Sequence, residues 1–364
     1  MCIMSKFSAF GVEAARFCER IGIERPVLNA PMSGIVDPAF VAAVCEAGGL
    51  GVVPAADLAP EEIRRFASEV RARTSRPFAV NLRPVQTWPV DTGKVLELFD
   101  ALSPLLESLD LPASPDEYDW SGAGVFSDFA AQFDAVLETA PAAVTASFGG
   151  FREPEADRLR AAGIFSVGTA TTLREAKVLR SAEVDALIVQ GSEAAGARLS
   201  FEDPDDVLMG LSALLPAAVR ATGLPVLAAG GIAEARQGAA LAMAGAAGCV
   251  LGTALLPTRE ARTTDAHKWF AANGSAVDTV TTRLFSGRLS RVLRSALWEA
   301  LADREPSSAP WPQPLVFMRA LEARARELGR DDLLALPLGQ SAGRSAWKTV
   351  GEAVTAIGSG FLPE

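Results

Sequence analysis

The sequence is short of the residues on which many kinds of functional site depend. Its 364 residues include one histidine, four cysteines and one tyrosine. A single histidine excludes a metal site built from several imidazoles, and it limits any histidine-based catalytic triad to His267. The four cysteines form no CxxC pair and are too few for a disulfide framework, which favours a reducing, cytoplasmic environment. We therefore expect a cytoplasmic protein without a metal ion.

Positive charge is scarce as well. Lys and Arg number 34 against 44 Asp and Glu, which gives a net charge of -10, and the arginines are scattered along the chain. Such a surface repels phosphate polymers and anionic membranes, so we expect neither nucleic acid nor membrane as a partner. The first 25 residues contain no apolar core of a secretory signal. The uncharged stretch 239–256 is interrupted by glycines and predicts a buried helix, a turn and a strand rather than a membrane span.

What the sequence does contain is a regular alternation of short apolar runs with amphipathic segments, typical of a parallel sheet whose strands are joined by helices. Eight runs are predicted to be strands: residues 26–30, 50–53, 77–81, 143–148, 163–167, 185–189, 224–229 and 248–251. Asp37 before Pro38 predicts the start of one connecting helix, and a capping box at 172–175 predicts another. Eight strand–helix units predict a TIM (β/α)8 barrel. The competing doubly wound sheet lacks its GxGxxG fingerprint after the first strand.

Two parts of the chain depart from this alternation. An insertion of about residues 84–124 follows the third strand and contains one predicted helix, 94–109. Beyond residue 257 the sequence is predicted to be mainly helical, with helices at 266–273, 290–301 and 314–328 and a final helix at 345–357. We therefore divide the chain into a barrel, residues 1–256 plus 339–364, and a helical subdomain, 257–338, placed beside the barrel mouth.

Residues that follow the strands are the first candidates for a site, because active sites of TIM barrels lie at the carboxyl ends of the strands. Gly230-Gly231 and Gly252-Thr253 follow strands seven and eight, where backbone N–H groups can hold a phosphate, although such glycines also make ordinary tight turns. Asn81 and Gln190 end two other strands. Their amides suit the polar edge of a heterocycle or, alternatively, cap loop backbone.

A set of short motifs in a fixed order resembles the nitronate monooxygenase family. That family is also called 2-nitropropane dioxygenase-like and includes flavin-dependent enoyl-carrier-protein reductases. The motifs are Leu-Asn-Ala-Pro-Met (28–32), Ala-Val-Asn-Leu (79–82), Gln-Gly-Ser-Glu-Ala (190–194), Ala-Ala-Gly-Gly-Ile (228–232), Leu-Gly-Thr (251–253), Asp-Thr-Val (278–280) and Phe-Ser-Gly-Arg (285–288). The resemblance spans residue 26 to about residue 294, and Gly339-Gln340 resembles a later motif of the family.

The resemblance implies a non-covalent FMN at the barrel mouth. Three residues after strand one would line the flavin ring, two amides with a neighbouring glycine would face its polar edge, and two loops would hold the phosphate. The residues implied at the flavin ring are Ala30, Pro31 and Met32, and those implied at its polar edge are Asn81, Gln190 and Gly191. The residues implied at the phosphate are Gly230, Gly231, Gly252 and Thr253.

The sequence departs from the family pattern where the family carries its catalytic histidine. Ala197 occupies that position, and Ser147 stands where many relatives have a second histidine. Three side chains are considered as replacements: Arg198 to hold an anionic substrate, Glu193 as a base, and Ser147 as a hydrogen-bonding group. A nitronate arrives already deprotonated and needs no base. His267 lies on the C-terminal extension, for which we expect a surface or packing role.

These observations lead to one preferred function and two alternatives. The preferred function is oxidation of a small nitronate by an FMN-dependent enzyme that uses O2. The first alternative is an NAD(P)H-dependent flavin reductase of an enoyl thioester or a quinone. The second is a barrel without catalytic activity, or one whose phosphate site takes a non-flavin ligand. A homodimer is compatible with each of them.

Overall fold

The computed structural model describes residues 11–84, 89–119, 126–202 and 207–362. Its centre is a barrel of eight parallel strands: β1 (Val27–Asn29), β2 (Gly51–Pro54), β3 (Phe78–Leu82), β4 (Ala143–Ala146), β5 (Phe165–Ala170), β6 (Ala186–Gln190), β8 (Val226–Ala229) and β9 (Gly248–Leu251). The strands pair in the order β2-β3-β4-β5-β6-β8-β9-β1. A parallel bridge between Leu28 and Leu50 closes the ring. The predicted TIM barrel is confirmed.

The seam between β1 and β2 is held by a side chain as well as by backbone. Asn29 donates its Nδ2 to the carbonyl of Val52 at 3.0 Å and accepts the N–H of Val52 at 2.7 Å. These two bonds replace backbone hydrogen bonds between β1 and β2, which share little backbone pairing. The side chain of Asn29 therefore helps to close the barrel at the edge of its mouth.

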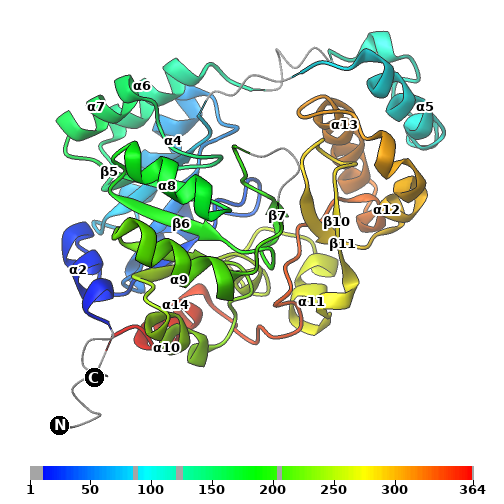
Figure 1. Ribbon diagram of the computed structural model, residues 1–364. Coiled ribbons are helices and arrows are strands. Elements are labelled where there is room, and N and C mark those ends of the chain that lie inside the picture. Colours follow the sequence, from blue (N-terminus) through cyan, green and yellow to red (C-terminus); the bar gives the residue numbers. More distant parts are fainter. Residues whose placement is uncertain (1–10, 85–88, 120–125, 203–206, 363–364) are drawn as a thin grey trace.

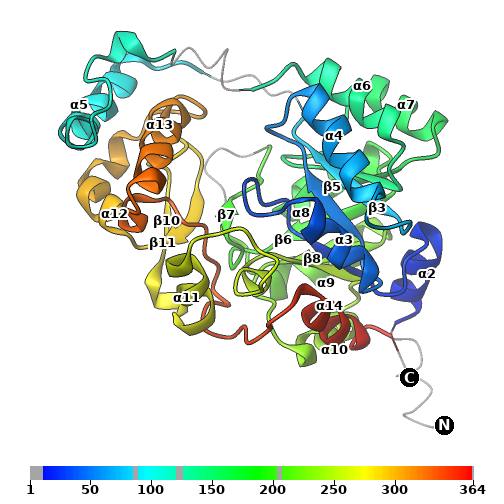
Figure 2. The same ribbon diagram turned by 180° about the vertical axis from the view of Figure 1, so that it is seen from behind.

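Helices surround the barrel between successive strands. They are α3 (Pro38–Glu46), α4 (Pro60–Arg71), α6 (Phe129–Thr139), α7 (Glu153–Ala161), α8 (Leu173–Ser181), α9 (Leu211–Thr222), α10 (Ala235–Met243) and α14 (Val350–Ser359). The predicted caps are confirmed: Asp37 accepts the N–H of Phe40, and Thr172 and Glu175 form the capping box. Figures 1 and 2 show the C-terminal α14 beside α10, where it completes the ring of helices.

The barrel is closed at the amino ends of its strands. Helix α2 (Val12–Ile21), which the sequence reasoning did not identify, turns its apolar face toward the inner side chains of the strands. Phe17 meets Phe165 edge to face, with ring centroids 6.0 Å apart. Among the described residues, apolar side chains fill this end, and the barrel is open to a ligand at the opposite, carboxyl end of the strands.

A second apolar core lies beyond the carboxyl ends of the strands. It is built from α5 (Thr92–Ser108), α11 (Asp265–Asn273), α12 (Ala296–Leu301), α13 (Pro314–Glu327) and the sheet described below. The rings of Phe99 in α5 and Phe317 in α13 lie 5.4 Å apart. Figures 1 and 2 both place α5 next to α13 and away from the barrel. The insertion after β3 therefore packs with the C-terminal segment, and we call this unit the cap.

The cap contains a small sheet that the sequence reasoning did not predict. Strands β10 (Thr279–Thr282) and β11 (Ser290–Leu293) are antiparallel, and β7 (Gly196–Ala197) from the barrel adds to β11. The predicted single helix 290–301 is therefore wrong in its first part, and only α12 is helical, beginning after the N-cap Ser295. The run at 290–293 is too short for its periodicity to distinguish helix from strand, and pairing with β10 decides the outcome.

Among the described residues, no helix has both the length and the apolar character needed to cross a bilayer.

Candidate functional site

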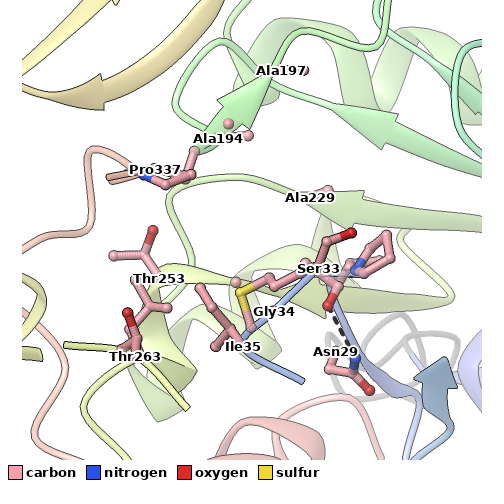
Figure 3. Close-up of a pocket in the computed structure, with 18 of the residues that line it drawn as sticks. Asn29, Ser33, Gly34, Ile35, Ala194, Ala197, Ala229, Thr253, Thr263 and Pro337 are labelled. Carbon is pink, nitrogen blue, oxygen red and sulfur yellow. Dashed lines mark hydrogen bonds between the residues drawn. The ribbon is translucent and has the colours of Figure 1, made fainter. Parts of the chain in front are cut away.

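A cavity of about 1090 Å³ lies at the carboxyl ends of the barrel strands, between the barrel and the cap. Most of the predicted site residues line it: Ala30, Pro31, Met32, Asn81, Ser147, Gln190, Glu193, Gly230, Gly231, Gly252 and Thr253, together with Ala197. Gly191 and Arg198 do not belong to the lining. Figure 3 shows the close-up, with Pro337 and Ala194 on the side of the cap and of β7, and Ile35 and Asn29 on the side of β1.

A chain of buried polar groups forms part of the cavity floor. Asn81 at the end of β3 donates to the hydroxyl of Thr145 at 2.9 Å, and the hydroxyl of Ser147 donates to Oδ1 of Asn81 at 3.1 Å. All three side chains are buried. Because the proton of Ser147 is directed at Asn81, its oxygen faces a ligand as an acceptor, which suits a hydrogen-bonding role and not that of a base.

Gln190 ties the end of β6 to the loop that carries β7. Its Nε2 donates to the carbonyl of Ala197 at 3.0 Å, and its Oε1 accepts the N–H of Leu199 at 2.9 Å. A primary amide has two hydrogens and two lone pairs, so one of each remains for a ligand in the cavity. The predicted alternatives for Gln190 are thus compatible, since the amide supports the loop and can still contact a heterocycle.

The loops after β8 and β9 form a cradle in which backbone comes close to the cavity. Gly230 and Gly231 have φ of 113° and 71°, and a Cβ on Gly230 would lie 2.9 Å from the backbone nitrogen of Ala194. Within the described part of the chain, no acceptor is assigned to the backbone N–H of Gly231 or Thr253. Thr253 accepts the N–H of Gly339 at 3.0 Å, so its own hydroxyl proton can be donated. This arrangement suits a bound phosphate.

The side chain of Glu193 binds the backbone at the start of α9. Both of its carboxylate oxygens accept the N–H of Leu211, the first residue of α9, at 2.9 and 3.1 Å. A Cβ on Gly191 would lie 2.1 Å from Oε2 of Glu193. Gly191 therefore makes room for the carboxylate and does not contact the cavity. The carboxylate of Glu193 binds the N-terminal end of helix α9.

Arg198 does not fit the predicted contact with an anionic substrate. It is 6% exposed, and its guanidinium donates to the carbonyls of Gln190 and Thr171, the latter at 3.0 Å. These bonds hold the loop between β6 and α9 beneath the cavity wall. The neighbouring Ala197 lines the cavity and pairs with Ser290 of β11.

His267 is buried in the wall of the cavity, although the sequence reasoning placed it outside the site. It is 1% exposed, its Nε2 lies 2.8 Å from the carbonyl of Pro337, and its Nδ1 lies 2.7 Å from the hydroxyl of Thr263. A carbonyl can only accept, so Nε2 carries the proton and Nδ1 accepts from Thr263. Burial lowers the pKa of His267 and favours the neutral ring. The predicted packing role is compatible with this geometry.

The cap adds charged side chains that the sequence reasoning missed. Glu322 of α13 lines the cavity, accepts from Arg326 at 2.9 Å and from the N–H of Ala335 at 3.3 Å, and has its pKa raised by burial. At the rim, Asp57 accepts from Arg83 at 3.0 Å and from Arg319 at 3.3 Å. In the sequence, Glu322 and Arg326 have the i, i+4 spacing of an ordinary surface pair, so no local signal marks them.

No cluster of three or more His, Cys, Asp or Glu side chains suited to a metal ion occurs in the parts of the chain that the structure describes. The cavity instead combines an anion cradle, neutral amides and apolar walls, and it is large enough for a cofactor together with a small substrate.

Comparison with known proteins agrees with this chemistry. The family model described as "Nitronate monooxygenase" matches residues 15–356. The chain is 34% identical over 334 residues to a nitronate monooxygenase of Paraburkholderia phytofirmans, with 88% of each chain covered. It is 33% identical over 329 residues to a nitronate monooxygenase of Pseudomonas aeruginosa, which covers 90% of this chain and 93% of the relative.

Solved structures show the same architecture. The nitroalkane oxidase of Streptomyces ansochromogenes superposes with a TM-score of 0.86 at 30% identity and covers 95% of this chain and 97% of that one. FabK of Thermotoga maritima superposes with a TM-score of 0.72 at 25% identity and covers 95% of both chains. The chain belongs to the nitronate monooxygenase family, a family of flavoproteins, and is an oxidoreductase.

Proposed function

We propose that this chain is an FMN-dependent enzyme that oxidises a small nitronate with O2 in the cytoplasm. The observation that carries the proposal is the cradle at the mouth of the barrel. There the N–H groups of Gly231 and Thr253 and the hydroxyl of Thr253 are available to a phosphate. A terminal phosphate is a feature of FMN, and the family is one of flavoproteins. Bound FMN would supply the two-electron chemistry that the side chains here lack.

Each part of the cavity has a task in this proposal. The loops after β8 and β9 would hold the phosphate, while Asn81 and Gln190 would face the polar edge of the flavin. The oxygen of Ser147, whose proton is directed at Asn81, would accept a hydrogen bond from the ligand. The cap covers the mouth through residues such as Pro337 and limits the access of water. A nitronate needs no proton removed, so the alanine at position 197 does not prevent its oxidation.

The first test concerns the cofactor. We expect purified protein to show a flavin absorption spectrum and to release about one FMN per chain on denaturation, without a covalent residue. A colourless protein that does not take up added FMN contradicts the proposal and favours a barrel for a non-flavin phosphate ligand. A bound flavin other than FMN contradicts the FMN assignment alone.

The second test concerns the reaction. We expect ethyl nitronate to bleach the bound flavin without air and to consume O2 when air is present. NADH and NADPH serve as the comparison under the same anaerobic conditions. Bleaching by NAD(P)H, with none by the nitronate, contradicts the proposal and supports a reductase of an enoyl thioester or a quinone. A flavin that neither reagent bleaches supports a barrel without this activity.

A further inference from the structure

We propose that Gln237 is a positioning residue for the phosphate of the cofactor, because its side chain fixes the loop after β8 with backbone N–H groups facing the cavity. The inference rests on the proposed function and deepens it, since it concerns the hold on the same FMN. Gln237 lies in the first turn of α10 and does not belong to the cavity lining. It therefore acts through the loop and not by touching the phosphate.

The side chain of Gln237 makes three hydrogen bonds to the loop that precedes it. Its Nε2 donates to the carbonyl of Gly231 at 2.8 Å. Its Oε1 accepts the N–H of Ala233 at 2.7 Å and the N–H of Glu234 at 2.9 Å. Turning the amide by 180° would set its N–H groups against the N–H groups of the loop. The loop and the amide therefore fit together in one orientation only.

The bond to the carbonyl of Gly231 sets the direction of the next N–H group in the chain. The peptide between Gly231 and Ile232 is trans, and the C=O and N–H of a planar trans peptide point in opposite directions. Because the carbonyl is bound to Gln237, outside the cavity lining, the N–H of Ile232 points away from Gln237. Gly231 and Ile232 both line the cavity, and over the described residues neither N–H has an assigned acceptor. Both groups can thus serve an anion, near the positive end of the α10 dipole.

Two consecutive glycines make such an anchor necessary. Gly230 and Gly231 both have positive φ, and a glycine pair has access to many other backbone conformations. A carbonyl turned toward the phosphate would repel it. The bond from Gln237 prevents that orientation at Gly231, and the indole Nε1 of Trp347 binds the carbonyl of Ala233 in the same way, at 2.8 Å. The loop is therefore held from outside the cavity by two side chains.

The test compares FMN with riboflavin, which has the same ring system without the phosphate. The flavin-free full chain is titrated with each flavin, and the quenching of flavin fluorescence gives the two Kd values. Gln237→Met keeps the length of the side chain and removes all three bonds, whereas Gln237→Glu keeps the two acceptor bonds and loses the donor to Gly231. The matched control is Gln132→Met. Gln132 of α6 is 2% exposed and donates to the carbonyls of Ala55 and Leu58 in the loop after β2.

The positioning role predicts a change in the preference for FMN over riboflavin. We expect Gln237→Met to raise the Kd of FMN about tenfold while the Kd of riboflavin stays near its wild-type value. We expect at least the same loss in Gln237→Glu, because its carboxylate cannot donate to Gly231 and adds negative charge near the phosphate. The Gln132→Met control is expected to keep the wild-type preference. A role of Gln237 in stability alone would weaken both flavins equally.

The outcomes separate this inference from the proposed function. A wild-type preference for FMN in Gln237→Glu, or an equal loss of affinity for both flavins in the Gln237 variants, overturns the positioning role and leaves FMN as the cofactor. If Gln237→Met does not fold, Gln237→Glu decides alone, since it retains the bonds to the start of α10. A wild-type chain that binds neither flavin overturns the proposed function itself.

Discussion

Glu193 accepts the backbone N–H of Leu211 through both carboxylate oxygens, at 2.9 and 3.1 Å, and so caps the first turn of α9. We predict that Glu193→Ala, which removes both acceptor oxygens, lowers the free energy of unfolding by about 1–2 kcal/mol, as for the loss of a helix cap. Urea denaturation measures the change, and Glu97→Ala on the exposed face of α5 is the control. If Glu193 were the catalytic base, the variant would instead keep its stability and lose turnover.

Arg198 is a second residue whose role follows from its partners. Its buried guanidinium donates to the carbonyls of Thr171 and Gln190. Removing it leaves buried carbonyls without a donor, so we predict that Arg198→Ala lowers the free energy of unfolding by about 2–4 kcal/mol. Denaturant unfolding monitored by circular dichroism tests this. Wild-type stability combined with a raised KM for anionic substrates would restore the contact that the sequence suggested.

Because Gly230 has no side chain, the loop after β8 can lie close to the backbone of Ala194. A Cβ there would meet the backbone nitrogen of Ala194 at 2.9 Å, and φ is 113°. We predict that Gly230→Ala weakens FMN binding at least about tenfold, or about 1.4 kcal/mol, measured by the fluorescence of released flavin. Gly223→Ala is the control because its φ of 64° is also positive while no atom lies within 4 Å of the added Cβ. Equal affinities in the two variants would mean that the loop after β8 does not hold the phosphate.

His267 is expected to link stability to pH. Burial lowers its pKa in the folded chain below the ordinary value of 6.5, while the nearby Asp331 acts in the opposite direction. Between the folded and the ordinary pKa the unfolded chain binds more protons. The stability that His267 contributes is therefore complete above pH of about 6.5 and falls, by at most about 1.4 kcal/mol per pH unit, as the pH decreases.

Denaturation of the wild type and of His267→Gln between pH 5 and pH 8 measures this contribution, and the variant should show the shallower pH dependence. Because the chain has a single histidine, one imidazole NMR signal reports its titration directly. Parallel pH dependences in the two proteins, or an imidazole that titrates at or above its ordinary pKa, would contradict the prediction.

Local sequence patterns were sufficient to predict the parallel barrel. The predicted strand 248–251 coincides with β9, and Asp37 caps α3 as expected. The strand β9 and the cap of α3 both depend on residues that are close in sequence, because apolar periodicity and side-chain capping are local features of the chain. The predicted helix 290–301 failed in its first six residues because β10 pairs with residues 290–293, and a partner of this kind lies outside any local window.

The sequence by itself determined the parallel barrel and the glycine loops at its mouth, because strand periodicity and the backbone freedom of glycine are local properties of the chain. Only the tertiary structure decided that α5 belongs to the cap, that Arg198 is bound to carbonyls beneath the loop, and that His267 and Glu322 line the cavity. The neighbours of these residues come from distant segments. Burial and partner choice, which set the protonation of His267 and Glu322, exist only once those segments are packed together.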